Sequence, residues 1–251
     1  MPVDDPGTWG VLLLAAFFGG GLNAVAGGGS FFTLPALVYA GYPALVANAS
    51  GTLALLPGYM ASTWGFREDL RAPRGVGMGA LLLASLAGGG LGALLLLWTS
   101  EEAFRALVPW LLLAATALFA AGPWLLRHIR RQGEASGAAQ LLSLFAICVY
   151  GGYFNGGVGI VLLAGLSLLG HQDLNRMNGL KNLLSTVLTA IAVSFYALGG
   201  VIAWGPALGM MLAAVAGGYV FARLARRLPA LAVRTVVVLT GVVMTLLFFF
   251  G

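Results

Sequence analysis

Charged residues are scarce in this sequence. Only 8% of its 251 residues are Asp, Glu, Lys or Arg, whereas 60% are hydrophobic. A soluble domain carries about 25% charged residues, so the composition excludes an ordinary soluble protein. Apolar runs of about 18 residues or more recur along the chain, and each can span a hydrocarbon core about 30 Å thick. The sequence therefore predicts one all-α, polytopic transmembrane domain over residues 1–251, surrounded by the lipid bilayer.

Several kinds of chemistry are missing as well. The single cysteine, Cys148, excludes an intrachain disulfide and a cysteine-rich metal site. No His/Cys/carboxylate cluster suggests a metal, no nucleophile with a neighbouring base is visible, and no Gly-x-x-x-x-Gly-Lys-[Ser/Thr] motif is present. The arginines lie in short links, which argues against nucleic acid as a partner. We expect neither an enzyme nor a cofactor.

The N-terminus also has too little positive charge for a signal peptide. Residues 12–18 followed by Ala-Val-Ala at 24–26 resemble one with its cleavage site, but the leader carries Asp4 and Asp5 and no Lys or Arg. Asp5-Pro6 is instead a good helix start, an N-cap followed by proline in the first turn. The first apolar run is therefore interpreted as a membrane segment.

Ten apolar segments are expected between breaks and polar links. They are residues 9–26, 30–40, 44–66, 75–98, 103–126, 140–155, 158–169, 174–198, 206–224 and a last one ending at 250. The second and seventh are too short to cross a bilayer alone. They either complete ten crossings or form re-entrant hairpins that leave eight. Residues 99–102 cap the fifth segment, where Glu101 and Arg105 are four apart and can pair.

One glycine–asparagine motif occurs twice. Setting Asn23 on Asn155 superimposes the glycines around it: Gly19 on Gly151, Gly20 on Gly152 and Gly27 on Gly159. After a two-residue slip, Asn48 falls on Asn178. Five segments per half is an odd number, which predicts two inverted repeats, 8–126 and 140–250, joined by a linker over 127–139.

Positive charge predicts the orientation. The links after the third, fifth and ninth segments are rich in arginine, whereas those after the fourth and eighth are not. Lys and Arg are enriched in cytoplasmic loops, so the first group, including the linker 127–139, is expected in the cytoplasm. If all ten segments cross, both termini lie outside.

The sequence resembles the TauE/SafE family of sulfite exporters and related permeases. The residues that carry the resemblance are 27–30 (Gly-Gly-Gly-Ser) with Pro35, 47–52 (Ala-Asn-Ala-Ser-Gly-Thr), 151–159 (Gly-Gly-Tyr-Phe-Asn-Gly-Gly-Val-Gly) and 178–182 (Asn-Gly-Leu-Lys-Asn). They extend over both repeats. The resemblance implies a multi-pass bacterial inner-membrane protein that moves sulfite, sulfonates or other small sulfur-containing or organic anions, and it leaves the cargo open.

The two motifs predict broken helices at residues 27–29 and 156–159. A broken helix exposes backbone N–H groups that can hold an anion without a formal counter-charge. Close packing is the alternative role of glycine in membrane helices, and we prefer it for Gly88–Gly92 and Gly217-Gly218. The predicted substrate-binding residues are Asn23, Gly28, Gly29, Ser30, Asn48, Ser50, Thr52, Asn155, Gly156, Gly157, Asn178, Lys181, Asn182 and Ser185.

Lys181 is the most informative single residue of this set. It lies about two turns into segment 174–198, with no acidic residue within a turn on that segment. A charge at the centre of a membrane helix has an apparent cost of about 3 kcal/mol, which a passing anion would offset. The alternative is that its long stem carries the ammonium to the interface.

These features predict a secondary anion transporter that acts as an exporter, with an alternating-access site at the repeat interface and a small anion as substrate. An anion channel or facilitator on the same scaffold is the alternative. All eight Asp and Glu residues are expected outside the segment middles. We therefore expect export to be driven by the membrane potential, without a coupling ion. The sequence leaves the oligomeric state open, a homo-oligomer included.

Overall fold

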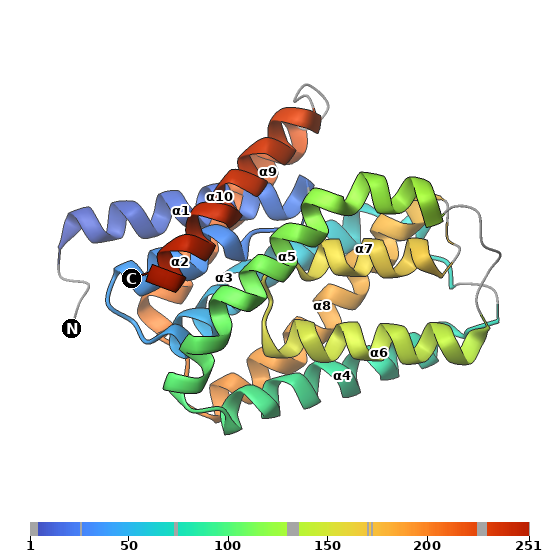
Figure 1. Cartoon of the computed structure of the whole chain (residues 1–251), viewed down its shortest axis with the longest axis horizontal. Helices are drawn as coiled ribbons and strands as arrows, with labels where there is room; N and C mark the ends of the chain where they lie inside the picture. The colour runs from blue at the N-terminus through green and yellow to red at the C-terminus, as the bar shows by residue number, and fades with distance from the viewer. Residues whose placement is uncertain are drawn as a thin grey trace.

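The apolar segments are helices throughout the part of the chain that the structure describes. This computed structural model describes residues 5–25, 27–72, 75–129, 136–169, 171, 173–224 and 230–250 (Figure 1). The helices are α1 (Pro6–Val25), α2 (Ser30–Tyr39), α3 (Ala44–Gly65), α4 (Met78–Trp98), α5 (Glu101–Ile129), α6 (Gly137–Tyr153), α7 (Val158–Leu168), α8 (Leu174–Leu198), α9 (Trp204–Leu224) and α10 (Ala230–Phe250). The all-α prediction is confirmed.

Five of the described helices, α1, α3, α4, α8 and α9, contain a stretch long and apolar enough to cross a membrane. Exposed aromatic side chains gather at both ends of the bundle. Tyr39, Trp98 and Trp204 lie beside the α2–α3, α4–α5 and α8–α9 links at one end, and Trp64 and Tyr219 lie at the other. Such belts mark the two membrane–water interfaces.

Side-chain caps begin α1 and α5 where the sequence places them, and α8 begins in the same way. The carboxylate of Asp5 accepts the Thr8 N–H at 3.1 Å, and that of Asp173 accepts the Arg176 N–H at 3.2 Å. Ser100 Oγ accepts the Ala103 N–H at 3.2 Å. Each cap satisfies an N–H that has no partner within the helix. The linker expected over 127–139 is shorter, because α5 continues to Ile129 and α6 begins at Gly137; residues 130–135 lie outside the described part.

The expected pairing of Glu101 with Arg105 is wrong. No ion pair joins these two described side chains; instead, the Glu101 carboxylate accepts the backbone N–H groups of Ala44 (2.5 Å) and Leu45 (3.0 Å). The first turn of α3 offers free N–H groups and a partial positive charge in a half-buried place. An exposed ion pair four residues apart on a helix gains only about 0.2–0.5 kcal/mol, so the bonds from Glu101 to the start of α3 are more favourable. The contact ties α5 to the start of α3.

The two short helices fold back along the helices that precede them. A Cβ added at Gly19 of α1 would lie 2.9 Å from Gly29 O and 3.2 Å from Thr33 of α2. In the same way, Val158 at the start of α7 lies beside Gly151 of α6. α2 has 10 residues and is therefore about 15 Å long, half of a bilayer core. The two hairpins, α1–α2 and α6–α7, enter the bundle from opposite ends (Figure 1).

The second break is placed slightly differently from the prediction of 156–159. α6 ends at Tyr153, so Asn155 lies in the break and not in the preceding helix. Gly159 already belongs to α7, which begins at Val158 directly after Gly157. Gly157 has φ 72°, a left-handed conformation that glycine adopts without steric cost, and it is this residue that turns the chain into α7.

Glycines bring two pairs of parallel helices into backbone contact. α1 packs on α9, where a Cβ added at Gly217 would overlap the carbonyl oxygen of Phe17. α4 packs on α6, where a Cβ added at Gly92 would overlap that of Val149. These contacts confirm the close-packing interpretation for Gly92 and Gly217. Between the two pairs, α3 packs against α8. Elsewhere, α5 packs against α10.

We expect Gly217→Ala to destabilise the protein. The added methyl has no room against the Phe17 carbonyl, and overpacking of this kind costs about 1–3 kcal/mol. The matched control is Gly218→Ala, one residue along, where the nearest atom to the new Cβ is Gly20 O at 3.5 Å. Thermal unfolding in detergent should show a fall of several degrees for Gly217→Ala alone. Equal unfolding temperatures for the two variants would contradict the packing.

Candidate functional site

The two helix breaks meet inside the bundle. A Cβ added at Gly27, in the first break, would lie 3.0 Å from Gly159 Cα, and one added at Gly159 would lie 3.0 Å from Gly27 Cα. Both glycines are buried. Gly27 has φ 84°, so this residue, like Gly157, turns the chain in a left-handed conformation. The tips of the two hairpins are therefore in contact, backbone against backbone.

Lys181 of α8 reaches this meeting point. A Cβ added at Gly159 would lie 3.4 Å from Lys181 Cδ, so the lysine stem passes over the start of α7. Only 2% of Lys181 is exposed. Among the described residues it has no hydrogen-bond partner and no carboxylate within ion-pair distance. Ser185 lies one turn further on the same face, and its buried Oγ has no partner either.

A hydrogen-bonded chain passes through the second break. Tyr59 of α3 donates its hydroxyl to Asn155 Oδ1 at 3.0 Å, and Asn155 Nδ2 donates to Thr189 Oγ1 of α8 at 3.4 Å. The Asn23 side chain of α1 contacts the same tyrosine, and its buried Oδ1 has no hydrogen-bond partner. The two repeat-related asparagines therefore both lie next to Tyr59.

The backbone carbonyl groups of the second break accept hydrogen bonds from side chains. Backbone groups freed inside a membrane protein must find partners, because lipid offers none. The donors are the hydroxyl of Tyr196 for Gly152 O, the amide of Asn48 for Tyr153 O (3.1 Å) and the hydroxyl of Tyr150 for Gly156 O (2.6 Å). With these carbonyl oxygens bonded, the break presents less negative potential to an anion.

The remaining predicted residues fall into two groups. Most of them are buried close to the breaks or on the helices that pack against the breaks: Gly28, Gly29, Ser30, Gly156, Gly157 and Asn182, with Asn178 half-buried. Two hydroxyls make structural bonds instead. Ser50 Oγ accepts the Ala203 N–H at 2.9 Å, and Thr52 donates to Asn48 O at 2.7 Å. Ser50 thereby fastens the α8–α9 link to α3, away from the breaks.

Two members of the central chain, Tyr59 and Thr189, are absent from the sequence-based set. A signal for them does exist. The register that places Asn48 on Asn178 also places Tyr59 on Thr189, eleven residues further along each helix. This aligned position of an apolar helix carries a hydroxyl group in both halves. The match therefore predicts a polar site that the two halves share.

Apolar helices of membrane-spanning length, aromatic belts at both ends and two buried helix breaks in contact define a polytopic membrane transporter. The comparison with protein families agrees. The model described as "Sulfite exporter TauE/SafE" matches residues 12–248, and the chain belongs to this family.

The chain is also similar to curated membrane proteins over nearly its whole length. It is 26% identical to the "Probable membrane transporter protein" of Haemophilus influenzae over 236 residues, 94% of this chain and 92% of that protein. It is 25% identical to "Probable membrane transporter protein ORF9" of Sinorhizobium sp, covering 94% and 90%, and 25% identical to "Probable membrane transporter protein YfcA" of Escherichia coli K12, covering 94% and 87%. No solved structure gives a significant match.

Proposed function

We propose that this protein is a secondary transporter that exports small sulfur-containing or organic anions, such as sulfite or sulfonates. The anion binds where the two helix breaks meet, against Lys181. One observation carries the proposal: a buried lysine without a partner in the described structure lies over Gly159, at its contact with Gly27.

The electrostatics of this place favour an anion. An isolated ammonium in the bundle interior is costly, and its burial argues against a side chain that reaches the interface. An anion beside it would offset that cost and could accept a hydrogen bond from Ser185. The N-terminal ends of the α2 and α7 dipoles add partial positive charge. The bonded carbonyls of the second break remove the groups that would oppose an anion.

Helix pairing supports an inverted repeat. The alignment of Asn23 with Asn155 also places Phe17 on Val149, and these two carbonyls contact Gly217 and Gly92 in the α1–α9 and α6–α4 pairs. Exchanging α1–α5 with α6–α10 converts each of these pairs into the other, and the same exchange relates α3–α9 to α8–α4. The opposite entry of the hairpins supports a two-fold axis in the membrane plane, through the Gly27–Gly159 contact.

The positions of the acidic residues bear on what drives transport. Every Asp and Glu in the described part lies in a link or at a helix end. Proton- and sodium-coupled transporters commonly place an ionisable side chain or a cation cage inside the bundle. Export of an anion from a negative-inside cell is favourable by about 2.3 kcal/mol per charge per 100 mV. The membrane potential is then sufficient for export.

We expect Lys181→Met to abolish or strongly weaken anion binding while the protein still folds. The methionine fills the stem's space over Gly159 and removes the charge that attracts the anion. Arg176→Gln is the matched control, because Arg176 lies on the same helix but is exposed and paired with Asp173. Binding of sulfite and of a sulfonate to the purified protein, by calorimetry, measures the effect. An unchanged affinity in Lys181→Met would show that the anion does not bind beside Lys181.

We also expect efflux to follow the membrane potential. Proteoliposomes loaded with sulfite and clamped at defined potentials should release it faster as the inside becomes more negative, with or without pH and sodium gradients. A saturable rate is expected of a transporter, whereas ohmic, unsaturable currents would indicate a channel. Efflux that ignores the potential and follows a proton or sodium gradient would contradict the proposal, and carbonyls at residues 27–29 would be the first place to seek a cation.

The proposed orientation predicts a pattern of chemical labelling. In a Cys148→Ala background, a membrane-impermeant maleimide should label Ser100→Cys in intact cells, because the α4–α5 link lies outside. Ala72→Cys, in the arginine-rich α3–α4 link, should be labelled only after permeabilisation. Both positions are exposed, so access depends on the side of the membrane. The reverse pattern would contradict the orientation.

A further inference from the structure

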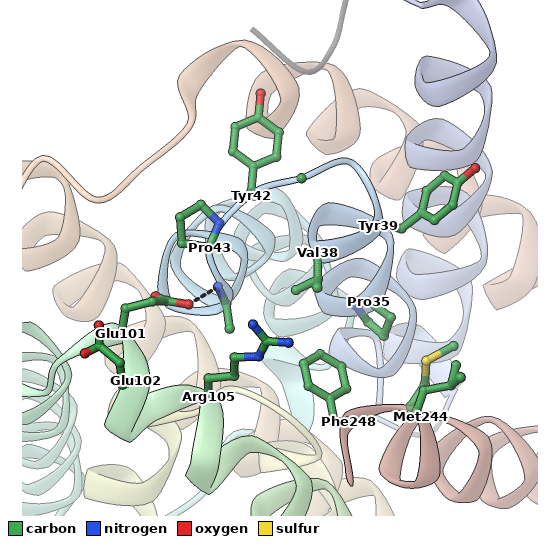
Figure 2. Close-up of a pocket in the computed structure, with 13 residues that line it drawn as sticks. Pro35, Val38, Tyr39, Tyr42, Pro43, Glu101, Glu102, Arg105, Met244 and Phe248 are labelled. Atoms are coloured by element: carbon green, nitrogen blue, oxygen red, sulfur yellow. Dashed lines mark hydrogen bonds between the residues drawn. The ribbon is translucent and has the colours of Figure 1, made fainter. Parts of the chain in front are cut away.

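A cavity lies apart from the helix breaks, at the end of the bundle that carries Tyr39 and Trp98. Its volume is about 720 Å³, and it is enclosed by the end of α2, the α2–α3 turn, the start of α5 and the end of α10 (Figure 2). The proposed anion site does not use it. The aromatic belt at this end places the cavity at the depth of lipid headgroups.

The cavity has an apolar wall and a charged wall. The apolar wall is formed by Val38 of α2 with Leu247 and Phe248 of α10. The charged wall is the start of α5, where Glu102 and Arg105 are three residues apart and share a face. Figure 2 shows Arg105 reaching from α5 into the space beside Phe248. A purely hydrophilic ligand would leave the apolar wall without a contact.

Arg105 is available to a ligand because Glu101 is engaged elsewhere. The Glu101 carboxylate accepts the N–H groups of Ala44 and Leu45. In the described part of the chain, Arg105 forms no ion pair, and its side chain is exposed. Glu102 is exposed as well. The wall therefore offers one cation and, one turn away, one carboxylate.

The cavity is continuous with the lipid-facing surface of α10. Leu247, one of its lining residues, is 57% exposed, and it belongs to a row of exposed apolar side chains along the same helix that includes Val243 and Leu246. Tyr39 lines the opposite rim and is 73% exposed. A hydrocarbon chain lying along α10 can enter the cavity without passing through water.

We propose that this cavity binds a phospholipid with an amine in its headgroup, phosphatidylethanolamine. Its phosphate binds the Arg105 guanidinium, which matches phosphate oxygens with two parallel N–H donors. Its ammonium binds Glu102, and one acyl chain lies against Val38, Leu247 and Phe248. The charge pattern selects this headgroup. A headgroup without an ammonium would leave the Glu102 carboxylate unpaired, and a choline has no N–H to donate to Glu102.

The test is lipid retention by the full-length protein. Wild type and variants are equilibrated in nanodiscs with equal amounts of phosphatidylethanolamine, phosphatidylcholine and phosphatidylglycerol, extracted briefly into mild detergent, and examined by native mass spectrometry. Wild type should retain mainly phosphatidylethanolamine. Arg105→Gln should reduce retained lipid about tenfold, and Glu102→Gln should abolish the preference over phosphatidylcholine. Val38→Trp, which fills the apolar side, should displace the lipid with Arg105 intact.

Two controls make the result decisive. Arg176→Gln removes another exposed arginine and should leave retention unchanged; size-exclusion profiles show that each variant is folded. Glycerophosphoethanolamine, the headgroup without acyl chains, should not compete at millimolar concentration. Unchanged retention in Arg105→Gln would overturn the proposal. So would a preference for phosphatidylglycerol, or competition by the chain-free headgroup or by inorganic phosphate, which would indicate a site for free anions.

Discussion

An interrupted helix inside a membrane has to find partners for its backbone groups within the protein, and this requirement shapes the centre of the bundle. At the second break, hydroxyl and amide donors from α3, α6 and α8 bond the carbonyls of Gly152, Tyr153 and Gly156. Those donors require that α3 and α8 pack directly beside the hairpin. The arrangement of the central helices thus follows from the need to satisfy one short irregular segment.

The two sequence motifs share their glycine and asparagine residues but differ in charge. The register that relates Asn48 to Asn178 places Lys181 opposite Gly51 and Ser185 opposite Leu55. Gly51 contributes close packing, with a Cβ position only 2.8 Å from Thr33 Oγ1, whereas Lys181 contributes the charge. Of these two aligned positions, only the one in the second half therefore carries a cation.

Much of this framework was predictable from the sequence, because glycine and asparagine are unusual inside apolar helices. Both breaks, the capped starts of α1 and α5 and the close packing at Gly217 follow from local rules. Long-range partners do not. Glu101 bonds to Ala44, 57 residues away, and no spacing rule reveals it. Ser50 illustrates the same limit. A polar hydroxyl within a motif predicts a substrate-binding residue, but its partner is the Ala203 N–H of the α8–α9 link.

The backbone contacts of α1 with α9, and of α4 with α6, restrict how the molecule can change shape. Each pair joins a helix from one sequence half to a helix from the other. In both interfaces backbone lies directly against backbone, which leaves no room for the helices to slide past each other. The helices of the two halves are therefore interleaved, and neither half packs as a separate body. A motion that separates them as whole bodies would break both interfaces at once. Any change of shape that preserves both interfaces has to move α1 together with α9 and α4 together with α6.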